Sequence, residues 1–200
     1  EAIEILGRNT TLPAEAWSRY DGVYYGNIAQ WLKYANSLKL RMAMRLSYVK
    51  SDVARAKAAE AIAGGVIEAN ADNAAMHAAE NRTTLIYNDW GDHRVGADIL
   101  CYMKDPRMEK MFLANDVGDY VGIRIGIDVT SKSQAVSKYS NMIVASDTPY
   151  LWFNAAEATF LRAEYELRWG SEETARSLYE AAVRLSFEER GASGADAYLA

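Results

Sequence analysis

The sequence predicts an all-α fold built from tetratricopeptide-like helical pairs, with an irregular, loop-rich insertion. Apolar residues between positions 31 and 49 recur every three or four places, which is the period of a helix. Small residues repeat with the same spacing at positions 54–61 and 175–182. Between positions 81 and 149 the helical period is lost. Two hundred residues, of which 50% are hydrophobic, suit one domain with a substantial core.

The first strong element is a helix over residues 31–49. Its apolar stripe consists of Trp31, Ala35, Leu38, Met42, Leu46 and Val49. We expect this face to be buried, with Leu38 and Met42 almost fully covered. Arg41 and Arg45 are four residues apart, so they project from one strip and require carboxylate or carbonyl partners.

A second helix is expected over residues 53–63, capped by Ser51-Asp52 and ended by Gly64-Gly65. Ala54, Ala58 and Ala61 lie on one face, which permits close approach of another helix. After a helix at 151–167, the residues Ala175, Tyr179 and Ala182 repeat this spacing. Small-large-small spacing is typical of tetratricopeptide helices, although an ordinary antiparallel bundle would explain these residues equally well.

The insertion at 81–149 has a different character. Residues 88–96 lack a helical period and are expected to form an exposed loop. Residues 99–103 and 107–113 suit short helices. Residues 120–127 alternate, with Gly at every fourth place, and could form a short strand or an extended ribbon.

The loop at 87–94 is the best candidate for a ligand site, because function often resides on loops held by a rigid scaffold. Tyr87 and Trp90 offer flat apolar faces, and the neighbouring polar side chains offer donors and acceptors. A sugar ring needs both kinds of partner. The candidate ligand-binding residues are Tyr87, Asp89, Trp90, Asp92, His93, Arg94 and Tyr120. Trp90 could equally plug the loop onto the helical core, whereas Trp31, Trp152, Phe153 and Phe160 are expected in the core.

Catalytic and metal-binding alternatives have little support. Asp89, Asp92 and Asp98 could supply paired carboxylates for a glycoside hydrolase, or calcium ligands, but no motif fixes their geometry. His77 and His93 lack the partners of a nucleophilic triad. We therefore expect no catalytic residue, no metal and no cofactor.

The overall composition excludes further classes. A net charge of −5 with interleaved acids and bases argues against nucleic-acid binding. No run of eighteen apolar residues is present that could span a membrane. The single cysteine, Cys101, is expected to be a small core residue.

Four segments, in order, resemble the SusD/RagB family of Gram-negative outer-membrane glycan-binding lipoproteins. They are the signature helix Trp31-Leu32-Lys33-Tyr34-Ala35-Asn36-Ser37-Leu38-Lys39-Leu40-Arg41-Met42-Ala43-Met44-Arg45, the preceding loop Tyr20-Asp21-Gly22-Val23-Tyr24-Tyr25-Gly26, the element Lys104-Asp105-Pro106-Arg107-Met108, and the late helical pair at 146–158 and 178–183. The resemblance extends over nearly all 200 residues. On residue chemistry alone, Asp105-Pro106-Arg107 would be ordinary helix-start chemistry.

The resemblance implies that residues 1–200 are the central part of a longer SusD-like domain. Residues 29–80 and 150–200 would form its helical scaffold, and residues 81–149 the insertion. It also implies a surface-exposed, non-catalytic lipoprotein of the outer membrane that takes part in polysaccharide utilisation and nutrient uptake. Such a protein binds an oligosaccharide and delivers it to a SusC-like TonB-dependent transporter, and its lipid anchor would lie outside this chain. A helical glycoside hydrolase and a helical-repeat scaffold for protein partners remain the alternatives.

Overall fold

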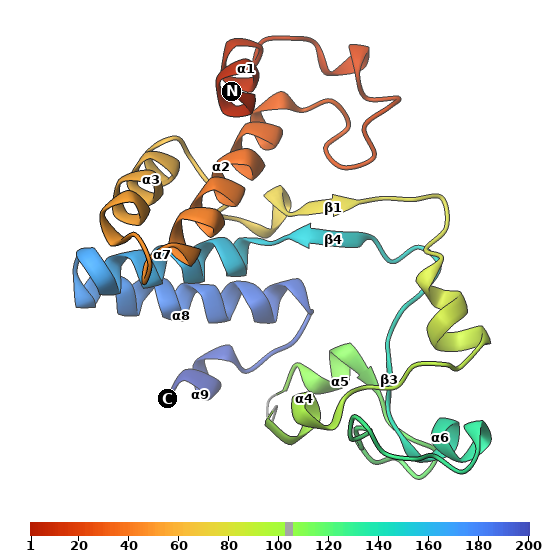
Figure 1. Cartoon of the computed structure of the whole chain (residues 1–200). Coiled ribbons are helices and arrows are strands. Elements are labelled where there is room, and N and C mark those ends of the chain that lie inside the picture. The colour runs from red at the N-terminus through yellow and green to blue at the C-terminus, as the bar shows by residue number, and fades with distance from the viewer. Residues whose placement is uncertain (103–105) are drawn as a thin grey trace. The chain divides into compact units, whose positions relative to one another are not determined.

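The computed structural model describes residues 1–102 and 106–200, with side chains omitted at 101–102 (Figure 1). The predictions for the Cys101 side chain, for Met103 and for Asp105 fall outside this described part. The chain divides into two compact units. We call residues 1–77, 150–189 and 199 the helical unit, and residues 78–149, 190–198 and 200 the loop-rich unit.

Helices dominate the helical unit, which confirms the prediction of an all-α, tetratricopeptide-like fold. Its helices are α1 (Ala2–Arg8), η1 (Ala14–Ala16), α2 (Ile28–Arg45), α3 (Ser51–Ala63), η2 (Asn70–Asp72), α7 (Ala155–Trp169) and α8 (Glu172–Glu189). The helices α7 and α8 run alongside each other, and α2 packs against both α3 and α7 (Figure 1). A short antiparallel ladder joins β1 (Ala74–Met76) to β4 (Tyr150–Phe153).

The prediction for the buried face of α2 was wrong. Leu40 is fully buried, whereas Met42 is 63% exposed. Two residues turn a helix by about 200°, so Met42 lies almost opposite Leu40. Leu38 is only half-buried, packed beside the cluster around Phe153. At the far end of the predicted stripe, Val49 is exposed.

Two polar residues explain this difference, because they occupy the buried face of α2. Asn36 donates hydrogen bonds from Nδ2 to the carbonyl oxygens of Gly64, at 2.8 Å, and Gly65, at 3.0 Å. Ser37 accepts one from the backbone N–H of Ile67 at 2.9 Å. Satisfied in this way, polar side chains can be buried at little cost.

Small residues let α3 approach α2 closely. Ala54, Ala58 and Ala61 are all fully buried, and the last two share a cluster with Leu40 and Met44. The helix begins at Ser51 with Lys50 at the cap position, so the prediction of a Ser51-Asp52 cap was wrong. Its predicted end is confirmed. Gly64 caps the helix, and Gly65 has a φ of +85°, a conformation that favours glycine.

An ion pair fastens α2 to α7. The Arg41 guanidinium donates to both carboxylate oxygens of Glu157, at 2.6 and 2.7 Å, and lies 4.0 Å from the centre of the Phe153 ring. The predicted carboxylate partner of Arg41 is therefore present. Phe153 is buried as expected, but Trp152 is 43% exposed, so its placement in the core was wrong. Trp31 and Phe160 are half-buried.

The loop-rich unit consists of short elements. They are η3 (Leu85–Asp89), α4 (Ala97–Tyr102), α5 (Met108–Met111), β2 (Phe112–Leu113), α6 (Lys132–Lys138) and β3 (Asn141–Met142), together with most of α9 (Ala195–Leu199). The strands β2 and β3 pair antiparallel. The helix predicted at 107–113 is shorter than expected, because it gives way to β2.

Three backbone segments meet at Ser140, which is fully buried. Its N–H donates to the carbonyl of Val121 at 2.7 Å, and its carbonyl accepts from Val95 at 3.0 Å. Its hydroxyl accepts from the N–H of Val121 at 2.9 Å. Residues 120–127, predicted as a short strand or an extended ribbon, include a parallel bridge between Gly96 and Ile123, which favours the ribbon over a regular strand.

A Cβ atom on Gly122 would lie 2.5 Å from Cα of Ala97, so only glycine fits at this crossing.

Among the helices of the described residues, none has the length and apolar character needed to cross a membrane.

Candidate functional site

The candidate loop begins with a π-helical turn, η3. The N–H of Trp90 donates to the carbonyl of Leu85 at 2.7 Å, and that of Asp92 donates to Ile86 at 3.2 Å. Gly91, with a φ of +63°, then redirects the chain. The loop predicted at 88–96 therefore begins inside a helical turn. Trp90 comes directly after that turn and is 56% exposed, rather than packed into a core.

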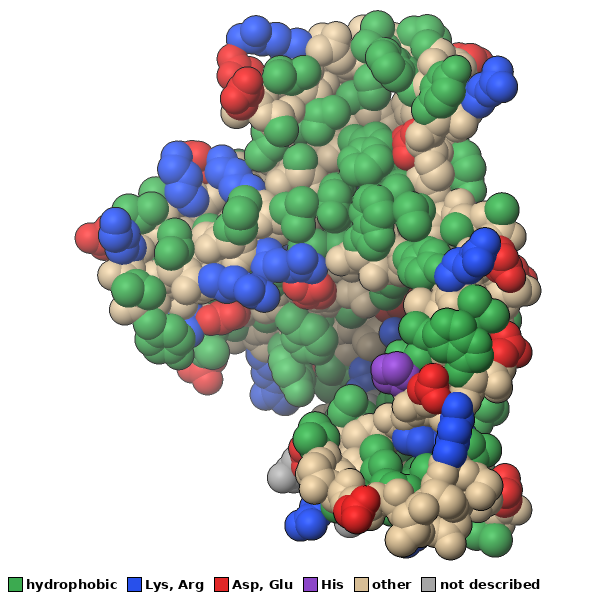
Figure 2. All heavy atoms as spheres, turned by 45° about the vertical axis from the view of Figure 1, so that its right-hand side comes forward, with side chains coloured by type: hydrophobic (Ala, Val, Ile, Leu, Met, Phe, Trp, Pro, Cys, Tyr) green, Lys and Arg blue, Asp and Glu red, His purple; other side chains and the backbone are tan. Residues whose placement is uncertain are grey.

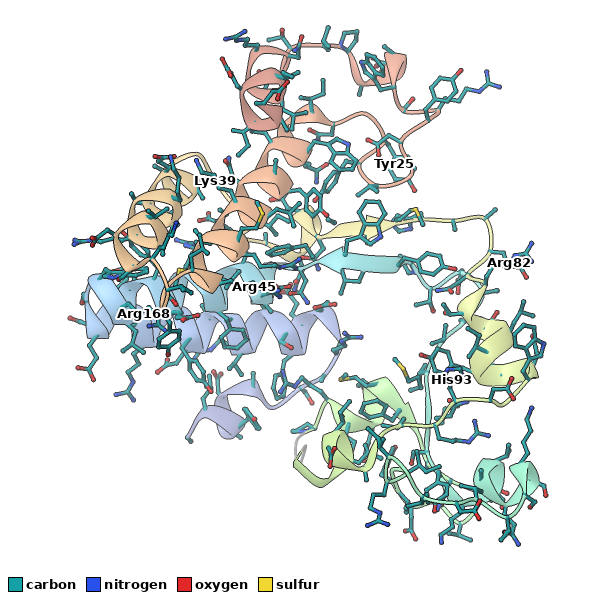
Figure 3. All side chains as sticks on the ribbon, viewed as in Figure 1. Tyr25, Lys39, Arg45, Arg82, His93 and Arg168 are labelled. Atoms are coloured by element: carbon teal, nitrogen blue, oxygen red, sulfur yellow. The ribbon has the colours of Figure 1, made fainter. Side chains whose placement is uncertain are left out.

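Two asparagine side chains hold this turn in place. Asn141 donates from Nδ2 to the carbonyl of Tyr87 at 2.6 Å, and Asn88 donates to the carbonyl of Val144 at 3.0 Å. The rings of Tyr87 and His93 meet edge to face, with centroids 5.8 Å apart. His93 is exposed on the loop (Figure 3).

The helix α6 fastens the far side of the loop. Its first turn is capped by Ser131, whose hydroxyl accepts from the N–H of Gln134 at 3.3 Å. Lys132 pairs with Asp92, Nζ to Oδ1, at 2.5 Å. Arg94 donates from Nε to the carbonyl of Ala135 at 3.3 Å. A second guanidinium nitrogen of Arg94 donates to the carbonyl of His93 at 2.6 Å.

Burial lowers the pKa of the Arg94 guanidinium from its ordinary value, and the nearby Asp116 carboxylate opposes that shift. An arginine remains charged at any physiological pH. Arg94 is thus a fixed, partly buried cation beside the loop.

The structure brings most, but not all, of the predicted site residues together. Tyr87, Trp90, Asp92, His93 and Arg94 lie on one loop braced by α6, and Asp89 is exposed at the end of η3. Tyr120 is half-buried, and the described hydrogen bonds and ring contacts do not connect it to residues 87–94.

The three aspartates considered for catalysis, Asp89, Asp92 and Asp98, are not arranged as a group of unpaired carboxylates. Asp92 is engaged by Lys132, and Asp98 lies in α4, a different element from η3. Among the side chains that the structure describes, at 1–100 and 106–200, no group of three His, Cys, Asp or Glu is placed to hold a metal ion.

The residues that position the site were missed by the sequence reasoning. Lys132 and Asn141 lie 40 and 54 residues from the groups that they hold, Asp92 and Tyr87. The only local signal was Ser131 before residues 132–138, a typical N-cap.

Mixed side-chain types cover the loop-rich unit (Figure 2). On the face shown, hydrophobic, acidic and basic side chains are interspersed. No extended field of one charge is visible there.

The comparisons with known proteins point to one family and extend over almost the entire chain. The model of a family described as SusD-like, Susd and RagB outer membrane lipoprotein, matches residues 1–200. A SusD homologue from Bacteroides thetaiotaomicron is 46% identical, with a TM-score of 0.94 over 98% of this chain and 44% of its own. A homologue from Bacteroides ovatus is 38% identical, with a TM-score of 0.88 and the same coverage of both chains.

A chitin-binding SusD homologue from Flavobacterium johnsoniae is 34% identical, with a TM-score of 0.88 over 99% of this chain and 44% of its own. The present chain therefore spans less than half the length of these solved relatives. A search of curated protein sequences gives no match.

Proposed function

Because the chain belongs to the SusD-like family of outer membrane lipoproteins, we propose that it binds an oligosaccharide at the cell surface and delivers it to a SusC-like TonB-dependent transporter. The chitin-binding description of one relative supports a carbohydrate ligand. Attachment to the membrane would use a lipid anchor outside residues 1–200.

The exposure of Trp90 is the observation that favours residues 87–94 as the glycan site. Its indole is more than half exposed at the end of a hydrogen-bonded turn. Asp89, Asp92 and His93 surround it in sequence and are exposed too. An aromatic face beside such donors and acceptors suits the C–H face and hydroxyls of a sugar ring.

The proposed role is binding without hydrolysis. A glycosidase needs two carboxyl groups across the scissile bond, one of them able to donate a proton. In this loop the Asp92 carboxylate is held by the ammonium of Lys132. A carboxylate engaged in this way is not free to face a scissile bond.

The first test is a glycan array followed by titration of the best ligand against Trp90→Ala. We expect binding to weaken by about 1–3 kcal/mol, typical of an aromatic contact at an interface, with little change in melting temperature. Trp17→Ala is the matched control, since Trp17 is similarly exposed, at 52%, but lies in the helical unit.

Two outcomes would contradict the proposal. A large fall in melting temperature with unchanged affinity per folded molecule would mean that Trp90 supports the fold and not the ligand. An array on which the intact protein binds no glycan would favour the alternative of a helical scaffold for protein partners. Co-purification with a TonB-dependent transporter from native membranes tests the delivery step.

A further inference from the structure

A small cavity lies on the other side of α6 from the candidate loop, entirely within the loop-rich unit. It measures about 180 Å³. Its walls come from the segment before α6 and from the end of α6 itself. The lining residues are Ile127, Asp128, Val129, Thr130, Gln134, Lys138 and Tyr139.

The helical period explains how α6 contacts the candidate loop with one face and lines the cavity with another. Gln134 and Lys138 are four residues apart and share the face that lines the cavity. Lys132 and Val136 share a different face. Lys132 pairs with Asp92, and a Cβ atom on Gly91 would lie 3.3 Å from the Val136 side chain. The helix therefore separates the cavity from the loop by about one helix diameter, ~10 Å.

Two exposed charged side chains, those of Asp128 and Lys138, line the cavity and do not pair with each other. Among the described residues, neither the Asp128 carboxylate nor the Lys138 ammonium has an ion-pair partner. The Lys138 ammonium lies 5.4 Å from the centre of the Tyr139 ring. One acceptor and one strong donor thus remain available to a ligand in the cavity.

The other side chains complete a mixed lining. The Thr130 hydroxyl donates to Oε1 of Gln134, and among the described residues the amide nitrogen of Gln134 has no acceptor. Ile127 and Val129 add aliphatic surface, and Tyr139 adds an aromatic ring. A ligand that fits must offer hydroxyls to donors and acceptors alike, and a C–H surface to the ring.

We propose that this cavity is a second saccharide subsite, which binds a single neutral sugar unit. The inference rests on the proposed glycan-binding function and adds a site that is independent of Trp90. A neutral polyol satisfies Asp128 and Lys138 together, because each of its hydroxyls can both donate and accept. The cavity volume of about 180 Å³ suits one sugar ring.

The test uses the intact protein and four probes, the methyl glycosides of glucose, galactose, mannose and N-acetylglucosamine. Binding is followed by saturation-transfer NMR and quantified by titration. We expect at least one probe to bind, and to bind Trp90→Ala equally well. Asp128→Asn and Lys138→Met should each weaken that binding about tenfold, the effect of losing a hydrogen bond to a charged group.

The matched controls are Asp119→Asn and Lys110→Met, which remove the same charges from exposed positions of the loop-rich unit outside the cavity. They should bind the probe as the unchanged protein does. Absence of binding by all four probes would overturn the subsite, as would binding that is lost in Trp90→Ala and kept in Asp128→Asn.

The two proposals can fail separately. Glycans bound on the array without any bound monosaccharide would leave the proposed function intact and refute the subsite. Monosaccharide binding that depends on Asp128 and Lys138, but not on Trp90, would support the subsite even if the loop proved not to bind glycan.

Discussion

Asp21 organises the loop between α1 and α2 by accepting four hydrogen bonds. Its Oδ1 accepts from the N–H groups of Val23 and Tyr24, at 3.0 and 3.1 Å. Its Oδ2 accepts from the N–H of Gly26 at 2.8 Å and from Nε1 of Trp31 at 2.7 Å. Burial raises the pKa of this carboxyl, but the hydrogen bonds, led by that from Trp31, outweigh burial and lower it from its ordinary value.

The Asp21→Asn substitution should lower the free energy of unfolding by about 1–3 kcal/mol at neutral pH. The amide nitrogen cannot accept, so two of the four donors lose their partner. Urea unfolding monitored by circular dichroism measures this loss. Glu15→Gln, which removes an exposed charge nearby, is the control and should change little.

The stabilisation that the Asp21 carboxylate provides should also depend on pH, and it should decrease in acid. A carboxyl group whose pKa is lower in the folded protein than in the unfolded chain stabilises the fold at any pH above its ordinary pKa. That stabilisation is lost as the pH falls through the lowered pKa of the folded state. The difference between Asp21→Asn and the unchanged protein should therefore shrink in acid. A difference that grows in acid would contradict this account of Asp21.

At the scale of elements, α2 allows the two candidate faces to be compared directly. Leu40→Ala should cost about 2–5 kcal/mol, because it removes buried methyl groups and leaves a cavity beside Ala58 and Val66. Met42→Ala, on the exposed side, should cost below about 0.5 kcal/mol. Chemical denaturation of both variants decides the matter, and equal costs would mean that Met42 is covered in solution.

The backbone crossing at Gly122 gives a second element-scale prediction. In Gly122→Ala the new methyl would overlap Cα of Ala97, so the loop-rich unit should lose its packing there. Gly96→Ala is the matched control, because a Cβ atom at Gly96 meets no atom within 4 Å. Hydrogen exchange should quicken over residues 95–97 and 121–123 in the first variant alone. Unchanged protection in Gly122→Ala would refute the tight crossing.

The helical period of residues 31–49 could be predicted from the sequence, but which face of the helix is buried could not. Residues 31–49 do form a helix over much of their length, but Asn36 and Ser37 lie on its buried side. Their partners are backbone groups of Gly64, Gly65 and Ile67, some 30 positions away. A periodicity argument treats buried polar residues as exposed, so it selects the opposite face whenever distant backbone satisfies them.

The site shows the same limit. Composition was enough to select residues 87–94 as a candidate site, because aromatic and polar side chains are mixed there without a helical period. The bonds that shape this loop come from Asn141, Lys132 and Ala135, which local sequence cannot connect to it. Whether these residues bind glycan remains a prediction for the Trp90 experiment.

At the scale of the whole molecule, we expect no glycoside hydrolysis. Incubation of the intact protein with the glycans of the array should release no new reducing ends. The physical reason is that the Asp92 carboxylate of the proposed site is already engaged by the ammonium of Lys132. Release of reducing ends that disappears in Asp92→Asn would overturn this view.

The pairing of β1 with β4 has a consequence for how such a protein can change over evolution. Met76 lies opposite Tyr150, so everything between them is in effect the loop of a single hairpin. The entropy of closing a loop grows slowly, by about 0.6 kcal/mol for each doubling of its length. The hairpin can therefore accept a longer, shorter or wholly exchanged segment while α2, α3, α7 and α8 keep their packing. If residues 87–94 bind the ligand as proposed, replacement of this one segment changes ligand preference at almost no cost to the framework that holds it.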